Sequence, residues 1–363
     1  MTKTADIIVI GAGAAGLGAA ARLAGDASVV VLEAEHAPCY HSTGRSAAIY
    51  VKSYGPPGVR AATAASEPFF LEPPSGLAEA PLLSPRGFLY VDYDGRGMDA
   101  LLATSPDLEP VTTEEAKELC PILKTAGMTA AAYETDSRDI DVDLLTTVYR
   151  RMMSAGGAAI EVNARVAALS RAGGVWRADT QAGAFEAPIV VNAAGAWASH
   201  VGALAGATPV EITPCRRSAA VAPIDMNVDR WPLVADADES WYARPMSGRL
   251  MISPADQDPV EACDIYPDDM VLAEGIDRFS RRVDFEVKRI ERTWAGLRSF
   301  APDGEPVVGF DPAAEGFFWL AGQGGYGIQT SPALSQLAAD LVLNRAPSLD
   351  AAAVEAMAAV RFA

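Results

Sequence analysis

Unbroken runs of apolar residues, rather than alternating ones, mark the first elements of this chain. Ile7–Ile10 is followed by a glycine cluster, an alanine-rich stretch and a second apolar run, Val29–Leu32. Short continuous apolar runs are typical of strands that are buried on both faces of a parallel sheet. The order of strand, glycine turn, helix and strand therefore predicts a βαβ unit.

The residues of the glycine cluster suit a dinucleotide. Gly11 permits a tight turn, Gly13 leaves the backbone open to a pyrophosphate, and Gly16 lets the helix pack close to the sheet. Phosphates would lie at the helix N-terminus, where unpaired N–H groups stabilise anionic oxygen. Glu33 can accept hydrogen bonds from the adenosine ribose hydroxyls, and it would repel a 2′-phosphate, which argues against NADP. This unit does not decide between NAD and FAD.

Later hydrophobic patterns predict an α/β chain with a second, largely antiparallel part. Helices are expected over residues 59–70, 142–154 and 332–343. Strands are expected over residues 87–92, 159–162, 166–169, 175–178, 189–192 and 317–321. Alternating runs between residues 207 and 292, such as 218–221 and 250–253, predict an antiparallel sheet that carries a substrate pocket.

Two further turns of small residues follow buried strands, at residues 193–198 and 322–331. Small residues at a strand end let the backbone approach a ligand closely. The second turn leads into a helix N-terminus, whose dipole would stabilise negative charge on a reduced flavin ring. A nicotinamide needs no such element, so this pattern favours FAD.

Residues 38–50 are small and polar, and they run into an alanine-rich stretch that could open a helix. Two interpretations stand side by side. The segment could be a second anion cradle to which Arg45 adds charge, or an ordinary capping segment with a solvated arginine.

Adjacent arginines begin one of the alternating strands. Side chains alternate between the two faces of a strand, so either Arg216 or Arg217 should lie on the covered face. A buried guanidinium requires an anion, which would be a carboxylate of the protein or of a substrate.

Charge and composition exclude several classes of partner. The 363 residues carry a formal net charge of −18, which disfavours nucleic acid and anionic membrane surfaces. The four cysteines form no CxxC pair and there are three histidines, so neither a zinc site nor a disulfide framework is expected. Without a signal-peptide pattern or a long apolar segment, the protein is expected to be cytoplasmic.

Taken together, these motifs resemble the D-amino-acid oxidase and glycine oxidase superfamily of FAD enzymes. Within it, the runs YHSTGRSAA, RRSA, TWAGLRSF and GGYGIQTS are most similar to the bacterial FAD-dependent D-arginine dehydrogenases. The resemblance implies noncovalent FAD and a glutathione-reductase-type FAD domain, interleaved with a mostly antiparallel β-sheet substrate domain. The FAD domain would comprise residues 1–86, 139–206 and 293–363, and the substrate domain residues 87–138 and 207–292.

The resemblance also implies roles for individual residues. Arg217 and Arg298 would bind the substrate carboxylate, Tyr54 and Tyr242 would line the pocket over the flavin, and Gly325 and Gln329 would contact the substrate or the ring. The cofactor would be bound by Gly11, Gly13, Ala14, Ala15, Gly16, Glu33, Ala34, Ser42, Thr43, Arg45, Ser46, Ala47, Ala48, Val166, Ala194, Gly195, Trp197, Gly296, Arg298, Gly324, Gly325, Tyr326, Gly327, Ile328 and Gln329.

Two positions depart from the pattern of the arginine enzymes. Ile49 stands in place of a histidine, and Phe88 stands in place of the acid that recognises a basic side chain. Cation–π contact recovers only part of a buried charge pair. The expected substrates are therefore D-amino acids with apolar or aromatic side chains.

The expected reaction is hydride transfer from the α-carbon to flavin N5, followed by hydrolysis of the imino acid to a 2-oxo acid and ammonia. Orientation is the protein's contribution, and no side chain is required as general base. Glycine, sarcosine, other N-alkyl amino acids and 2-hydroxy acids would suit the same carboxylate site. A flavin-holding subunit without a substrate of its own is a third alternative. The electron acceptor, whether oxygen, a quinone or another carrier, is left open.

Overall fold

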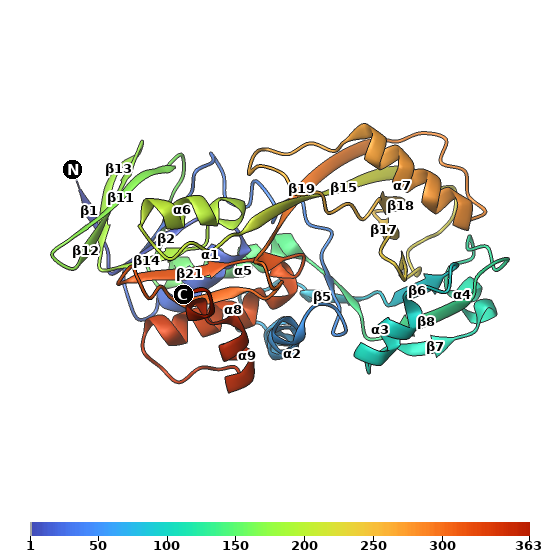
Figure 1. Cartoon of the computed structure of the whole chain (residues 1–363), viewed down its shortest axis with the longest axis horizontal. Helices are drawn as coiled ribbons and strands as arrows, with labels where there is room; N and C mark the ends of the chain where they lie inside the picture. Colours follow the sequence, from blue (N-terminus) through green and yellow to red (C-terminus); the bar gives the residue numbers. More distant parts are fainter. Residues whose placement is uncertain (1) are drawn as a thin grey trace.

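The computed structural model describes residues 2–363, and its largest elements are two separate sheets (Figure 1). The first sheet has six strands in the order β10-β3-β2-β14-β21-β20. Its members are β2 (Ile7–Ile10), β3 (Val29–Leu32), β10 (Ala159–Glu161), β14 (Ile189–Asn192), β20 (Val307–Phe310) and β21 (Phe317–Ala321). All neighbours pair in parallel except β20, which is antiparallel to β21.

The six-stranded sheet is buried on both faces, as its apolar runs predict. Ile7 and Val9 belong to a core to which several helices contribute, among them α1 (Ala14–Leu23), α5 (Val142–Ala155) and α8 (Gly327–Val342). Ile8 and Ile10 face the opposite core. That core is shared with α6 (Ala198–Leu204) and with a four-stranded sheet of β1 (Lys3–Thr4), β13 (Gly183–Ala187), β12 (Val175–Thr180) and β11 (Val166–Ala172).

The second large sheet has nine strands in the order β22-β19-β15-β18-β17-β16-β6-β8-β7. Their bounds are β6 (Phe88–Asp92), β7 (Glu109–Val111), β8 (Ala130–Glu134), β15 (Thr213–Pro223), β16 (Leu233–Asp236), β17 (Tyr242–Met246), β18 (Arg249–Ser253), β19 (Arg292–Phe300) and β22 (Gln323–Gly324). The sheet is antiparallel except where β16 meets β6. Helix α7 (Asp269–Arg282) packs on β15 and β18.

Smaller elements connect the two sheets. A three-stranded sheet contains β4 (Ile49–Tyr50), β9 (Arg138–Ile140) and β5 (Leu83–Pro85). The remaining α-helices are α2 (Pro57–Leu71), α3 (Met98–Thr104), α4 (Thr113–Leu119) and α9 (Ala351–Met357), and η1 (Gly195–Trp197) and η2 (Ala359–Phe362) are 3₁₀ turns. Within residues 2–363, every helix is too short or too polar to cross a bilayer.

The predicted α/β class is confirmed, but two local expectations change. Helix α8 begins at Gly327, five residues before the expected start, so Pro332 lies inside its first turns. Residues 46–48 form no helix. Strand β22 and all of β19 except Arg292 lie in the segment 293–363 and pair in the nine-stranded sheet, and the division of the chain into two domains stays a prediction.

Candidate functional site

A cavity of about 370 Å³ is lined by both large sheets, a size typical of ligand sites. It is lined by most of the residues predicted to bind a cofactor. These are Gly11, Gly13, Ala14, Ala15, Glu33, Ala34, Ser42, Thr43, Arg45, Ser46, Ala47, Ala48, Val166, Ala194, Gly195, Trp197, Gly296, Arg298, Gly324, Gly325, Gly327, Ile328 and Gln329. Gly16 and Tyr326 are absent from this wall, while the predicted substrate residues Ile49, Tyr54, Phe88, Arg217 and Tyr242 belong to it.

The glycine turn between β2 and α1 has no room for side chains. Gly11 has a φ of +100°, and a Cβ atom there would lie 2.5 Å from the carbonyl oxygen of Ala193. A Cβ atom on Gly16 would lie 1.9 Å from the carbonyl oxygen of Gly11, so Gly16 shapes the turn from behind. The backbone N–H of Ala14 donates to Thr43 Oγ1 over 3.0 Å. The turn thus brings the start of α1 to the cavity.

Glu33 is buried at the end of β3 and its carboxylate is held in a fixed orientation. Oε2 accepts from the N–H of Ala12 over 2.7 Å, and Oε1 accepts from the N–H of Glu35 over 2.9 Å. A carboxylate has about four acceptor positions, so capacity remains for hydroxyl groups in the cavity. This arrangement fits the ribose of an adenosine group.

The predicted residue Trp197 belongs to a group around Glu35 whose other members, His41 and Arg165, were not predicted as site residues. The rings of His41 and Trp197 lie 4.6 Å apart, and His41 Nε2 lies 3.2 Å from Glu35 Oε1. Arg165 also donates to Glu35 Oε1 over 3.1 Å. His41 and Arg165 line the cavity. The sequence gives no spacing signal for this group, because its members come from three separate segments.

The predicted anion cradle at residues 38–50 takes a different form. Arg45 forms an ion pair with Asp264 and donates to the carbonyl oxygens of Ile265 (3.0 Å) and Ala295 (3.2 Å). Its guanidinium is therefore not a solvated group, and its contribution to an anion site stays a prediction. Arg244 donates to the carbonyl oxygens of Ala47 and Ala48. In a helix, these two oxygens would accept hydrogen bonds from backbone N–H groups instead. This explains why residues 46–48 form no helix.

The Arg45–Asp264 contact leads to a prediction about cofactor retention. Asp264 holds the cavity-lining residues Arg45 and Tyr40, the latter through a 3.1 Å hydrogen bond from its hydroxyl. Asp264→Asn should weaken FAD binding roughly fivefold, a modest change because the carboxylate is partly exposed. Titration of the apoprotein with FAD, followed by flavin fluorescence, measures the change. Glu261→Gln removes an exposed charge from the same segment and should leave FAD affinity unaltered; equal affinities for both variants would contradict the role of Asp264.

The glycine turn before α8 lies against Arg298. A Cβ atom on Gly325 would lie 2.3 Å from Arg298 Nη2, so glycine is needed for this approach. The Tyr326 ring packs on Tyr54 at a centroid distance of 4.9 Å and so supports the wall from outside. Gln329 lines the cavity, but its amide is bonded to the protein. Its Oε1 accepts from the N–H of Val51 over 3.1 Å, and its Nε2 donates to Thr63 Oγ1 over 2.9 Å.

Arg217 and Arg298 lie on the same face of neighbouring strands. Cys215 is opposite Arg298 and Arg217 is opposite Gly296 in the β15–β19 ladder, so the two arginines are diagonal neighbours. Gly296 leaves space beside Arg217. Arg216 points the other way and pairs with Asp256 and Asp258. The structure thus decides which of the adjacent arginines reaches the cavity.

Neither Arg217 nor Arg298 forms an ion pair with a carboxylate of residues 2–363. Arg298 Nη2 donates to the Tyr54 hydroxyl over 3.0 Å, and Arg217 Nε donates to the carbonyl oxygen of Asp256 over 2.8 Å. Arg217 also lies over the Tyr242 ring. Burial lowers the pKa of Arg298, but Tyr54 and Tyr242 raise it above its ordinary value, so the group stays charged. Two cations without an anion fit a bound carboxylate.

The far end of the cavity is apolar and aromatic. Phe88 stacks on Tyr90 with ring centroids 4.2 Å apart, and Ile49 and Leu233 line the same cavity. Burial raises the pKa of Tyr90 well above its ordinary value, so its hydroxyl is neutral. Glu239 also lines the cavity, from the exposed turn after β16, and has a φ of +57°. Its contribution was not foreseen, because nothing in the sequence places that turn at the cavity.

The buried Asp236 just before this turn makes stability depend on pH. Burial raises the pKa of its carboxyl to about 6, with a further contribution from Asp238. The folded protein therefore holds this proton to higher pH than the unfolded chain, so stability falls as pH rises from about 4 to 6. Asp236→Asn should stabilise the protein more at pH 8 than at pH 4, and should therefore raise Tm more at pH 8. The two gains in the free energy of unfolding should differ by at most about 3 kcal/mol. Thermal denaturation of this variant and of the exposed Asp225→Asn checks the difference; equal gains at both pH values would count against it.

Comparisons with known proteins agree with this geometry. Residues 6–341 match the family described as FAD dependent oxidoreductase (DAO). Human mitochondrial sarcosine dehydrogenase is 28% identical over 256 residues, which cover 65% of this chain and 27% of that protein. Glycine oxidase of Geobacillus kaustophilus is 28% identical over 254 residues, which cover 67% of this chain and 65% of that protein. The crystal structure of glycine oxidase from Geobacillus kaustophilus shares the fold, with a TM-score of 0.87, 21% identity and 99% coverage of both chains.

Proposed function

Because this chain belongs to the DAO family of FAD-dependent oxidoreductases, we propose that it oxidises the α-carbon of a free amino acid. Its cofactor is FAD, as the glycine turns predict. The closed turn at Gly11, the oriented carboxylate of Glu33 and the turn at Gly324 all lie on one cavity and fit that group. The observation that carries the substrate class is the pair of uncompensated cations, Arg217 and Arg298, in the same wall.

The residues of the chain would bind and orient the substrate. Arg298 and Arg217 would hold its carboxylate, and each loses no protein ion pair in doing so. The Tyr54 hydroxyl already accepts a hydrogen bond from Arg298, so its own proton points elsewhere and can meet the substrate amine or carboxylate. Tyr242 would cover the substrate from the side of Arg217. Bound FAD supplies a two-electron acceptor for the hydride.

The reaction is balanced without further reagents up to the reduced cofactor. If bound FAD accepts a hydride from the α-carbon, the neutral amine becomes an iminium ion, and water converts this ion to a 2-oxo acid and an ammonium ion. Holding the carboxylate at two points fixes its plane and the C–Cα axis, and a contact of the amine with Tyr54 would limit rotation about that axis; such orientation contributes a large share of the rate. The cavity holds no carboxylate that must act as a general base in this scheme.

We further propose that the substrates are D-amino acids with apolar or aromatic side chains. The stacked Phe88–Tyr90 pair and Ile49 would receive such a side chain by burial of apolar surface. The D configuration is proposed from the likeness of the sequence motifs to D-amino-acid enzymes. Glu239 supports a second possibility, a side chain long enough to place a cation beside that exposed carboxylate.

A second candidate is oxidation of glycine, sarcosine or another N-alkyl amino acid. It is favoured by the similarity to sarcosine dehydrogenase and glycine oxidase, at 28% identity each. The same carboxylate site would serve these substrates, and a 2-hydroxy acid would also fit it. The apolar space near Phe88 would then be left unfilled, which is why the larger D-amino acids are preferred here.

An anaerobic substrate screen tests both proposals. The purified flavoprotein is mixed with D- and L-amino acids, glycine, sarcosine and 2-hydroxy acids, and loss of flavin absorbance is recorded. D-leucine and D-phenylalanine should reduce the flavin fastest, and admission of air then shows whether oxygen reoxidises it. Faster reduction by sarcosine would support the second candidate. Reduction by none of them would leave a flavin-holding subunit that lacks a substrate, and would overturn both proposals.

A further inference from the structure

We propose that Asp256 is a positioning residue that directs Arg217 into the cavity. The inference rests on the proposed binding of a substrate carboxylate by Arg217. Asp256 does not line the cavity, and its side chain is almost completely buried behind β15, with 2% of its surface exposed. Asp256 would act on Arg217 through its own backbone, because Arg217 donates a hydrogen bond to the Asp256 carbonyl oxygen.

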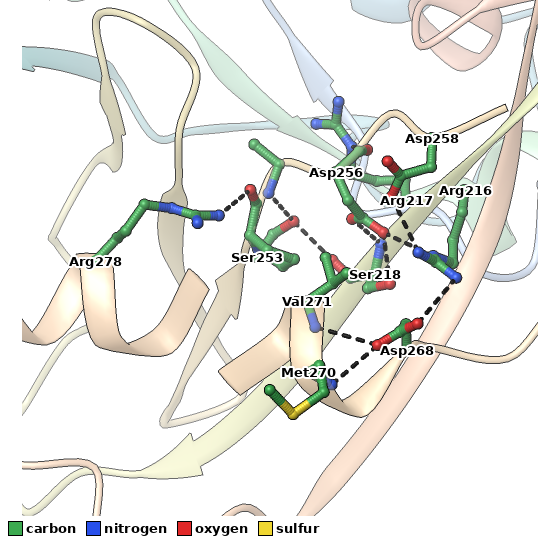
Figure 2. A network of polar contacts seen from close by, with 12 residues as sticks. Arg216, Arg217, Ser218, Ser253, Asp256, Asp258, Asp268, Met270, Val271 and Arg278 are labelled. Atoms are coloured by element: carbon green, nitrogen blue, oxygen red, sulfur yellow. Dashed lines mark hydrogen bonds and ion pairs between the residues drawn. The ribbon is translucent and has the colours of Figure 1, made fainter. Parts of the chain in front are cut away.

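Three donors from β15 fix the Asp256 carboxylate. Oδ1 accepts from the N–H of Ser218 over 2.6 Å, and Oδ2 accepts from the Ser218 hydroxyl over 2.8 Å. Oδ2 also accepts from Arg216 Nε over 3.1 Å. Figure 2 shows Arg216 among the carboxylates of Asp256, Asp258 and Asp268. Charge-assisted bonds of this kind are strong when they are buried, so residue 256 has little freedom to move.

The fixed residue then holds Arg217 from the other side. Arg217 Nε donates to the Asp256 carbonyl oxygen over 2.8 Å, which is the shortest polar contact of that guanidinium. A second contact, from Nη2 to Gln257 Oε1, is 3.5 Å long and correspondingly weak. Because a guanidinium is planar, a fixed Nε leaves its Nη groups pointing in a defined direction. That direction is toward the cavity, over the Tyr242 ring.

The neighbouring backbone shows how the chain reaches this geometry. Ala255 has a φ of +54°, a conformation that is costly for alanine and that needs support from its surroundings. Its N–H donates to Ser253 Oγ over 3.1 Å, and Ser253 Oγ donates to the carbonyl oxygen of Ser218 over 2.6 Å. Ser218 therefore contacts Ser253 on one side of Ala255 and Asp256 on the other. The adjacent arginines of β15 therefore contact the same residue, Asp256. Arg216 donates to its carboxylate, and Arg217 donates to its carbonyl oxygen.

The test compares two matched carboxylates. Asp256→Asn keeps the shape of the side chain but removes its charge, whereas Asp258→Asn removes a charge that is mostly exposed and that contacts Arg216 alone. We expect Asp256→Asn to raise KM for the amino acid about tenfold with less than a threefold change in kcat, since a misdirected anchor weakens carboxylate binding. Benzoate binding, followed by the shift in flavin absorbance, should weaken by the same factor. Asp258→Asn should change neither.

A double-mutant cycle separates an effect on the orientation of Arg217 from an effect on the overall stability of the protein. In an Arg217→Ala background there is no guanidinium to direct, so Asp256→Asn should add less than a twofold further effect on benzoate binding. Equal losses in both backgrounds would overturn the inference. If Asp256→Asn does not fold, Ser218→Ala, which removes one of the three donors, should show the same pattern with a smaller rise in KM. Unaltered KM in that variant would likewise overturn it.

The outcomes for the proposed function are distinct. If the wild-type flavoprotein binds benzoate and Arg217→Ala weakens that binding to a measurable residual affinity, carboxylate recognition stands, whatever Asp256→Asn does. If the wild type binds no carboxylate, or if Arg217→Ala binds it equally well, the proposed role of Arg217 fails and the positioning role fails with it.

Discussion

Arg298→Ala should retain bound FAD and its yellow colour and yet lower kcat/KM by about a thousandfold. The guanidinium lies on β19 and has no carboxylate partner within residues 2–363, so its charge is available to the substrate. Loss of one charged, two-point contact with a carboxylate corresponds to about 4 kcal/mol of transition-state stabilisation. Steady-state kinetics with the best substrate of the screen, together with the flavin spectrum, measure the effect.

Two controls isolate the charge of Arg298. Arg298→Lys keeps the charge but loses the planar fork, so it should recover only part of the activity. Arg249→Ala removes an arginine of β18 that pairs with Glu291 at the surface, and it should leave kcat/KM unchanged. Turnover of Arg298→Ala equal to that of the wild type would contradict the carboxylate role.

Phe88→Glu should raise activity on D-arginine relative to D-leucine by about a hundredfold. Phe88 is 8% exposed, so a carboxylate at this position would be desolvated in the cavity wall. A buried charge is strongly unfavourable until an opposite charge pairs with it, and the guanidinium of D-arginine would supply that partner. The same carboxylate would also remove the apolar surface that receives the leucine side chain. The ratio of the two kcat/KM values is the measurement.

A neutral variant shows whether charge or shape causes the change. Phe88→Gln has nearly the shape of the glutamate variant, and it should lose activity on D-leucine without gaining activity on D-arginine. Glu239 is the internal check, because it supplies a carboxylate to the wild-type cavity. If Glu239→Gln lowers activity of the wild type on D-arginine, the exposed turn already recognises basic side chains. A D-arginine to D-leucine ratio that is the same in Phe88→Glu and in the wild type would refute the assignment of Phe88.

Local patterns were sufficient to predict the family and its cofactor. Four-residue apolar runs can be buried on both faces only inside a covered parallel sheet, and Ile7–Ile10 and Val29–Leu32 are found there. Glycines that a turn requires for steric reasons are visible in the sequence, because Gly11 and Gly16 have no space for a Cβ atom. The family resemblance and FAD followed from such motifs and are confirmed.

The tertiary structure decided how the charged side chains are used. Alternation predicted that one of two adjacent arginines would be covered, but only the register of β15 against β19 places Arg217 beside Arg298. Arg45 could be assigned from the sequence either to an anion cradle or to solvent, and only the folded structure shows its ion pair with Asp264, more than two hundred residues away. The sequence by itself determined the backbone framework, because strand burial and glycine turns depend on near neighbours in the chain. The partners of each charge depend on distant segments that meet only in the folded protein.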